Sequence, residues 1–510
     1  MNLPAALALM AASGFAALAY QIVWTQQSSI WLGHESTAVL AVIGAFFAGL
    51  AIGAHALSHR VEASPRPALW YAACEAVIGV WGVVLALLMA PAGETLLRLI
   101  GDTPSAAWQA SVAFVGTFLL LLPATAAMGA TLPALERVLA RSSSGQSLAA
   151  LYAGNTFGAV LGVLAAAFWL VPEFGLTRTT LLCALLNLLC AAATLLLFPR
   201  HDLPVPTAPA LPRSKGLMPL LAVTGLLGIG YEVLVVRVLR QVAENTVYTF
   251  AMLLAVYLVG TALGAAAYQR WSCRASPERR GDTLLLALAF SCLLGTASLW
   301  MAEEIKALFL HTAGAGMGSA LAAEALLAAV AFLLPTIVMG ALFSHLCTRA
   351  LAEGVGFGRA LAGNTLGAAA APWVFGLLFA PAFGPKAALL AVVVGYALLA
   401  VRRSGWARPV ALGAATAALA VFSPPLAFVE VPEGGRIVSY RDGAMGAVSV
   451  VEDASGVSRL RIDNRQQEGS SATRLTDARL ALLPVLLHPA PRRALFLGLG
   501  TGVTALSARS

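Results

Sequence analysis

The sequence predicts an all-α polytopic membrane bundle that is followed by a small tail containing a β-sheet. The chain is 59% hydrophobic and 11% charged, with a mean hydropathy of +0.83. Apolar runs of about 20 residues, the length that crosses a bilayer as a helix, recur along most of the chain. The apolar part also contains an internal duplication. These observations exclude a soluble globular protein and predict a lipid bilayer as the first partner.

The duplication is clearest in two stretches that lie 211 positions apart, Ser13 to Gly53 and Thr224 to Gly264. Each has an apolar run, a short polar break and a second apolar run that ends in small residues four apart. This pattern is typical of a transmembrane hairpin whose second helix packs closely. Later equivalents are Thr125, Met128, Gly129, Gly154, Asn155 and Thr156, which return as Thr336, Met339, Gly340, Gly363, Asn364 and Thr365.

Each half is predicted to hold six membrane spans. They lie near 4–32, 36–58, 69–91, 107–134, 148–171 and 177–199 in the first repeat (1–200), and near 217–239, 246–270, 283–302, 319–347, 359–381 and 385–401 in the second repeat (217–403). A proline-rich linker, 201–216, joins them. An even number of spans gives both repeats the same orientation, so we expect the parallel-repeat plan of a major-facilitator-like bundle.

The basic residues indicate the orientation of the bundle. The net charge of +8 comes from arginines between apolar runs, as in membrane loops, which argues against a nucleic-acid partner. Basic residues collect after the even-numbered spans, so the N-terminus is predicted to be cytoplasmic in a multi-pass inner or plasma membrane protein. The first run is too long for a signal peptide and reads as a retained span. Residues 404–428 form a possible thirteenth helix; whether they cross the membrane, and hence the side of the tail, stays open.

The tail begins at residue 429, where charge rises. Alternating stretches over 446–452 and 458–463 predict strands joined by tight turns, and 476–487 predicts a helix. Residues 494–497 predict a short buried strand that leads into Gly498, Gly500 and Gly502. A strand followed by alternating glycines is typical of the first turn of a Rossmann-like sheet, so 429–491 reads as a β region with a helix and 492–510 as the incomplete start of a Rossmann-like domain.

The order of these tail features resembles the membrane-fused spermidine synthase family. The residues that carry the resemblance are Gly443 to Glu452, Ile462 and Asp463, Gln467, Leu483 to Pro489 and Arg492 to Gly502 in the tail, and Gly14, Tyr20, Met128 to Pro133 and the two Gly-Asn-Thr copies in the bundle. The resemblance implies aminopropyl transfer to a polyamine from decarboxylated S-adenosylmethionine, or a related transfer from S-adenosylmethionine. It places Gln467 on the nucleoside side of the pocket and Gly498, Gly500 and Gly502 beside the cofactor.

Two departures from the family pattern bear on activity. Gly469, Ser470 and Ser471 stand where soluble spermidine synthases have an acidic pair. The family's ribose-binding acid and catalytic aspartate would both lie beyond Ser510. We therefore assign no catalytic residue to this chain and expect it to be a fragment of a longer protein, or else to carry an inactive remnant. The six cysteines form no metal-binding or disulfide pattern, so no metal is predicted.

Ionisable and polar residues inside the apolar runs are the candidates for a membrane site. Glu75, Glu232 and Glu324 are carboxyl groups at membrane depth, where each should face a cavity or a partner. Glu232 follows Tyr231 and precedes Arg237, whereas the first copy has Tyr20, Gln21 and Gln26 at the equivalent positions. The second repeat thus keeps two charges that the first lacks. Glu232 is read either as a cation or proton site, or as a structural hydrogen-bonding group.

Asn155 and Asn364 either line a central pathway or bond across packed helices. Two functions are then compatible with the sequence. The complete protein is a membrane-anchored aminopropyltransferase, or the bundle carries a small cationic or polyamine-like solute and the tail is vestigial or regulatory. The sequence predicts no oligomeric state.

Overall fold

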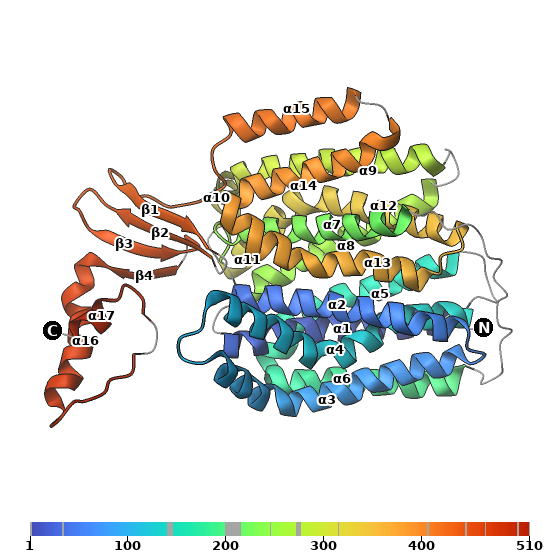
Figure 1. Ribbon diagram of the computed structural model, residues 1–510, viewed down its shortest axis with the longest axis horizontal. Helices are drawn as coiled ribbons and strands as arrows, with labels where there is room; N and C mark the ends of the chain where they lie inside the picture. Colours follow the sequence, from blue (N-terminus) through green and yellow to red (C-terminus); the bar gives the residue numbers. More distant parts are fainter. Residues whose placement is uncertain are drawn as a thin grey trace.

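The computed structural model describes residues 3–32, 35–139, 146–198, 216–244, 246–271, 277–314, 316–404, 407–443, 446–464, 466–496 and 499–508. All but the last residue of the predicted linker, and Gly498, lie outside these ranges. The described chain forms a bundle of long helices with a small sheet and two helices at one end (Figure 1). The sheet and the N-terminus lie at opposite ends of the bundle.

The two repeats are built from matching helices. The first contains α1 (Leu3–Leu32), α2 (Glu35–Glu62), α3 (Pro67–Ile100), α4 (Ala106–Leu139), α5 (Gln146–Ala165), η1 (Ala166–Leu170) and α6 (Val171–Leu197). The second contains α7 (Leu217–Leu239), α8 (Val247–Trp271), α9 (Pro277–Ser298), η2 (Leu299–Met301), α10 (Ala302–Ala313), α11 (Met317–Ala328), η3 (Ala329–Leu333), α12 (Leu334–Ala352), α13 (Phe357–Ala371), η4 (Pro372–Phe379) and α14 (Ala380–Ser404).

Ten helical segments of the described chain are long and apolar enough to cross a membrane. Two of them are unusually long, 48 and 44 residues, and each is broken at a glycine with non-helical backbone angles, Gly175 (φ 72°) and Gly384 (φ 80°). At 1.5 Å per residue, either segment would be about twice as long as a bilayer is thick if it were straight. Each break therefore divides its segment into two crossings, which gives the twelve predicted spans.

Equivalent helices make equivalent contacts in the two halves. In the first repeat α1 packs on α5, α2 on α4 and α3 on α6; in the second α7 packs on α13, α8 on α12 and α9 on α14. The halves meet through α2 with α13 and α5 with α8, which are also equivalent pairs. This arrangement confirms the predicted bundle of two parallel six-helix repeats.

Twin glycines fix the closest helix contacts. A Cβ atom added to Gly53 would lie 1.8 Å from the carbonyl oxygen of Ala126, and one added to Gly264 would lie 1.8 Å from that of Ile337. Gly14 and Gly225 meet the backbone of Asn155 and Asn364 in the same way. Only a residue without a side chain allows the backbones to approach this closely.

After the bundle, α15 (Ala407–Phe422) returns along α14. The Lys386 ammonium group, near the start of α14, donates hydrogen bonds to Ala420 O (2.8 Å) and Ser423 O (2.5 Å) at the end of α15. The two helices are therefore antiparallel. At 16 residues α15 is about 24 Å long, somewhat shorter than the hydrocarbon core. Because α15 runs back along α14, the tail begins at the end of the bundle where α7 ends.

The tail starts with an antiparallel sheet in the order β1 (Arg436–Asp442), β2 (Ala447–Glu452), β3 (Ser458–Ile462) and β4 (Gln466–Ser470). Then follow η5 (Ser471–Thr473), α16 (Arg474–Leu487) and α17 (Val503–Ser507). The predicted strands over 446–452 and 458–463 and the predicted helix are confirmed. In the turn between β2 and β3, hydrogen bonds from Ser455 and Val457 lower the pKa of Asp453 to about 2.

The predicted strand over 494–497 is wrong for its described residues. Residues 491–496 form no regular structure, and Leu495 is 85% exposed. A strand needs a hydrogen-bonding neighbour, and no segment in the described ranges pairs with this stretch. The local apolar pattern fits a buried strand, but the described residues form no sheet that would bury this stretch.

Candidate functional site

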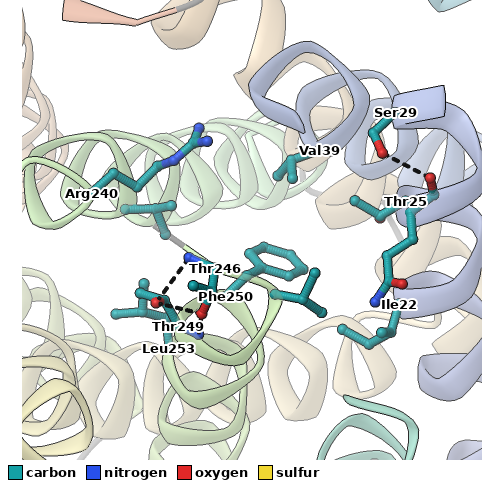
Figure 2. Close-up of a pocket in the computed structure, with 12 residues that line it drawn as sticks. Ile22, Thr25, Ser29, Val39, Arg240, Thr246, Thr249, Phe250 and Leu253 are labelled. Carbon is teal, nitrogen blue, oxygen red and sulfur yellow. Dashed lines mark hydrogen bonds between the residues drawn. The ribbon is translucent and has the colours of Figure 1, made fainter. Parts of the chain in front are cut away.

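Two adjoining cavities lie between the repeats, at the end of the bundle that carries the tail. The first has a volume of about 50 Å³ and lies between α1, α2, α7 and α8. Figure 2 shows its wall: Thr25 and Ser29 from α1 face Thr246, Thr249 and Phe250 across the cavity, with Arg240 at the end of α7. The Thr25 and Ser29 hydroxyls donate to carbonyls of their own helix, Gln21 O and Gln26 O. The cavity is thus mostly apolar, with a few polar groups.

The second cavity contains Glu232. It is of similar size and shares Val39, Val236, Arg240 and Phe250 with the first. Glu232 is 6% exposed, and no hydrogen-bond donor to its carboxylate is found in the described part of the chain. The hydroxyl of the adjacent Tyr231 does not reach this carboxylate, because it donates to Ala331 O (3.0 Å) on η3. The structure therefore places an unpaired carboxyl group in a cavity between the repeats.

Arg237 lines the same cavity but binds the tail. Its guanidinium donates to the Asp442 carboxylate at the end of β1 (Nε to Oδ1, 3.1 Å) and to Gly443 O. The side chains of Arg237 and Asp442 are only 13% and 9% exposed. Burial raises the pKa of Asp442, and the nearby Arg237 charge opposes that rise. Of the two charged groups that follow Tyr231 in the sequence, Arg237 is thus paired with the tail, whereas Glu232 has no hydrogen-bond donor among the described residues.

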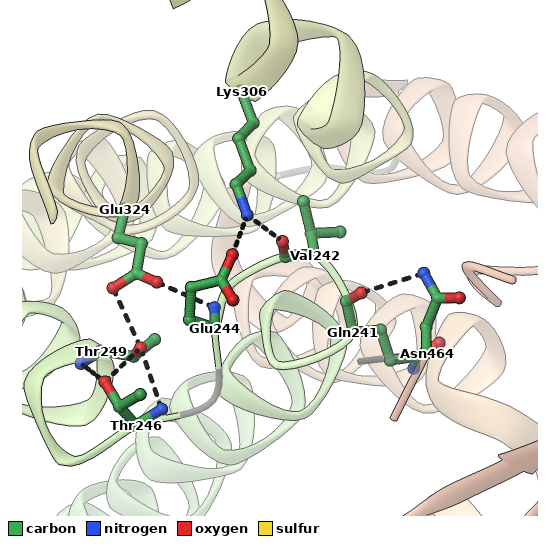
Figure 3. Close-up of polar contacts among 8 residues, drawn as sticks. All are labelled: Gln241, Val242, Glu244, Thr246, Thr249, Lys306, Glu324 and Asn464. Carbon is green, nitrogen blue, oxygen red and sulfur yellow. Dashed lines mark hydrogen bonds and ion pairs between the residues drawn. The ribbon is translucent and has the colours of Figure 1, made fainter. Parts of the chain in front are cut away.

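Further contacts hold the tail against the Glu232 cavity. Gly446 and Asp463, from the turns before β2 and after β3, line the cavity together with Glu232. Beyond the end of α7, Gln241 Oε1 accepts the backbone N–H of Phe428 (3.0 Å). The Asn464 side chain donates to Gln241 O (3.4 Å), as Figure 3 shows. Two turns of the sheet therefore rest on the bundle and form part of the wall of the Glu232 cavity.

A polar network fixes the loop between α7 and α8 (Figure 3). Glu324, on α11, accepts hydrogen bonds from the Glu244 backbone N–H and the Thr249 hydroxyl, both at 2.9 Å. Lys306, on α10, donates to Val242 O and to the Glu244 carboxylate, both at 2.9 Å. Glu324, unlike Glu232, has its carboxylate satisfied by protein donors. Its contacts position the cavity wall.

The remaining predicted bundle residues lie around the helix contacts. Tyr20 stacks on Trp24, with ring centroids 4.8 Å apart, and Gln21 is buried. Asn364 donates to Leu221 O (3.1 Å) across the contact between α13 and α7, while Asn155 lies against Gly14 at the equivalent contact of α5 and α1. Neither asparagine lines either cavity.

The tail residues assigned to a cofactor lie at one edge of the sheet. Gln467 is exposed on β4; Gly500 (φ 51°) and Gly502 (φ 77°) form a turn whose Thr501 contacts Gly469. Gly498 lies outside the described residues. A nucleoside site of the Rossmann type needs the carboxyl ends of parallel strands, and every strand pair in the described tail is antiparallel. The assignment of Gln467, Gly498, Gly500 and Gly502 to a cofactor site therefore stays a prediction. The described chain also contains no cluster of three metal-binding side chains.

Sequence reasoning missed the residues through which the tail contacts the bundle: Gln241, Asp442 and Asn464. Asp442 precedes Gly443, and an Asp-Gly pair is typical of a tight turn. The sequence did contain one signal, the adjacent Asp463 and Asn464. Asp and Asn tolerate positive φ better than other side chains, and these two residues adopt φ of 48° and 61°. That signal indicates a tight turn, but not what the turn contacts.

Comparison with known proteins adds two likenesses. No protein-family model matches the chain. The polyamine aminopropyltransferases of Mycobacterium tuberculosis and Mycobacterium bovis are 28% identical to it over 197 residues. That match covers 38% of this chain and 36% of each of those relatives.

Among solved structures, a bacterial homologue of the human lysosomal transporter Spinster aligns over 81% of this chain and 95% of its own, with 13% identity and a TM-score of 0.45. The POT family transporter PepTSo aligns over 82% and 96%, with 13% identity and a TM-score of 0.42. By its ten long apolar helical segments the described chain is a polytopic membrane bundle, and it has a partial likeness to polyamine aminopropyltransferases.

Proposed function

We propose that the bundle binds and carries a small organic cation, of the alkylammonium or polyamine class, in the cavities between its repeats. The observation that carries this proposal is the Glu232 carboxyl group. A charged group at the centre of a membrane helix costs roughly 3 kcal/mol by insertion measurements, and this one has no protein donor in the described chain. A bound cation would remove that cost.

The surroundings of Glu232 fit such a solute. Arg237 lines the same cavity, but its charge is engaged by Asp442, and Arg240 has an interaction of its own. The rest of the wall is largely apolar, which suits the methylene groups of an alkylammonium ion. The partial match to polyamine aminopropyltransferases supports a polyamine as the first solute to test.

The test is uptake of labelled spermidine into proteoliposomes that contain the full chain. Glu232→Gln keeps the shape of the side chain but removes its charge, and we expect at least a tenfold loss of uptake. Glu303→Gln is the matched control, because Glu303 is an exposed glutamate of the same repeat, and it should leave uptake unchanged. Equal uptake by Glu232→Gln and the wild type would remove Glu232 from the mechanism and overturn the proposal.

A second candidate function rests on the aminopropyltransferase match. The tail would then be the first part of a transferase domain that uses decarboxylated S-adenosylmethionine, and the bundle would anchor it. The tail lies at the opposite end of the bundle from the N-terminus. With the N-terminus in the cytoplasm, as the basic residues predict, the tail faces outward, away from cytosolic adenosylmethionine derivatives. The test is a reporter that is active only in the cytoplasm, fused after Phe428. Activity of this fusion would place the tail in the cytoplasm and favour the transferase.

A further inference from the structure

A second buried carboxyl group lies in the first repeat, away from both cavities. Glu75 is on α3, and its side chain contacts Asn187 on α6. The two residues are 0% and 1% exposed. They lie where α3 and α6 pack together, and neither residue lines either cavity between the repeats.

The hydrogen bonds of this pair are half complete. Asn187 Nδ2 donates to Glu75 Oε2 at 2.7 Å. The other oxygen of each group, Glu75 Oε1 and Asn187 Oδ1, is buried without a hydrogen-bond partner in the described chain. A carboxylate and an amide oxygen both only accept hydrogen bonds, so two acceptors are left unsatisfied together. Each unsatisfied buried polar atom destabilises the folded state.

A single proton satisfies both atoms. A protonated carboxyl group has one O–H donor, and an amide has one acceptor oxygen beside its N–H donors. With the proton on Oε1, the acid donates to Asn187 Oδ1 while Oε2 accepts from Nδ2. The result is a neutral acid–amide ring held by two hydrogen bonds, and it leaves no net charge at membrane depth.

The surroundings supply no positive charge that would favour a carboxylate instead. The titratable groups near Glu75 are Tyr71 and Cys74 on α3, Tyr20 on α1 and Cys190 on α6, all neutral at pH 7. The Ser13 and Tyr71 hydroxyls lie within reach of the carboxyl group, but the Tyr71 hydroxyl donates to Leu9 O, and among the described residues neither hydroxyl forms a hydrogen bond to Glu75 Oε1. The described chain has no arginine or lysine paired with Glu75.

We propose that Glu75 and Asn187 form a proton-binding site in the first repeat: the proton is held between Glu75 Oε1 and Asn187 Oδ1 while α3 and α6 are packed as seen here. Separation of the two helices would break the ring, admit water and release the proton. The site is independent of the solute that the cavities bind, so its test does not require transport.

The test is infrared difference spectroscopy of the purified full chain, since a protonated carboxyl group absorbs apart from carboxylates. Glu75→Gln is the matched variant, because a glutamine amide can form the same two-bond ring with Asn187 and should fold. We expect a protonated-carboxyl band at pH 7 in the wild type that is absent in Glu75→Gln. A wild-type spectrum without such a band would show a carboxylate at Glu75 and overturn the proposal.

Asn187→Leu tests the ring itself. Loss of the amide partner should shift the frequency of the Glu75 band, because the O–H loses its acceptor, while Asn364→Leu, an asparagine of the other repeat, should leave the band in place. An unchanged band in Asn187→Leu would show that the proton is not shared with Asn187. Glu75→Gln with normal spermidine uptake would leave the proton site standing and separate it from the proposed transport.

Discussion

The two repeats share their helix packing but differ in their buried polar groups. Equivalent glycines make equivalent backbone contacts, and Gly175 and Gly384 break the helices at equivalent places. Yet the first repeat has Gln21 and Gln26 where the second has Glu232 and Arg237. Packing is therefore preserved through residues without side chains, while the polar and charged groups beside them differ between the repeats.

The buried carboxyl group of the first repeat, Glu75, has no equivalent in the second repeat, just as Glu232 has none in the first. The hydroxyl of Tyr20 lies against Gly82 and that of Tyr231 against Gly295, so these glycines are equivalent. Aligned on them, α9 has Leu288 where α3 has Glu75. At the position of Asn187 the second repeat has Tyr396, whose hydroxyl donates to Thr224 O (3.3 Å). Among the described residues, Glu75 on α3 and Glu232 on α7 are thus buried carboxyl groups with incomplete hydrogen bonding, one in each repeat and on helices that are not equivalent.

The shared packing can be broken at either member of a twin pair. Gly53→Ala and Gly264→Ala each place a Cβ atom 1.8 Å from a backbone oxygen, so helices must move apart. We expect each to lower the free energy of unfolding by about 3 kcal/mol, measured by thermal unfolding in detergent. Gly413→Ala is the control, because nothing lies within 4 Å of its added Cβ. Similar losses from both twins would support equivalence; a loss from only one would contradict it.

The difference between the repeats can be tested at Arg237. Arg237→Gln leaves the largely buried Asp442 carboxylate without its cation, and we expect docking of the tail to weaken by about 2 kcal/mol. Gln26→Arg, at the equivalent position of the first repeat, should not affect docking. The measurement is hydrogen–deuterium exchange of the β1 and β2 amides, which should become faster in Arg237→Gln alone.

Two further variants isolate the ion pair. Arg436→Gln removes an exposed arginine that pairs with Glu452 within the sheet, and should change exchange little. Arg237→Asp combined with Asp442→Arg restores the pair with reversed charges and should recover part of the protection. Unchanged exchange in Arg237→Gln would mean that the remaining contacts, such as Gln241 with Phe428, hold the tail by themselves.

Sequence reasoning predicted the spans and their close contacts because these signals are local. Hydropathy marks a span, and a glycine four residues from another marks a close contact. It could not predict the partner of Arg237, because Asp442 lies 205 positions away and nothing near either residue names the other. The apolar stretch at 494–496 misled for the same reason: a strand depends on neighbours that local pattern does not contain.

The smallest expected difference lies in the twin tyrosines. Pro335 has no N–H to donate to Ala331 O, four residues before it, and the Tyr231 hydroxyl donates there instead (3.0 Å). In the first repeat the equivalent carbonyl, Leu120 O, accepts from the Trp81 indole (2.8 Å), and the Tyr20 hydroxyl has no partner in the described chain.

Tyr231→Phe should therefore lower the free energy of unfolding by about 1 kcal/mol, because it leaves a buried carbonyl without this donor. Tyr20→Phe should be neutral or slightly stabilising, because it removes a buried hydroxyl that has no partner. Thermal unfolding of the two variants side by side measures the difference. Equal losses would mean that the Tyr20 hydroxyl has a partner, such as an ordered water; then the repeats would be alike at this position too, and only the charged residues would separate them.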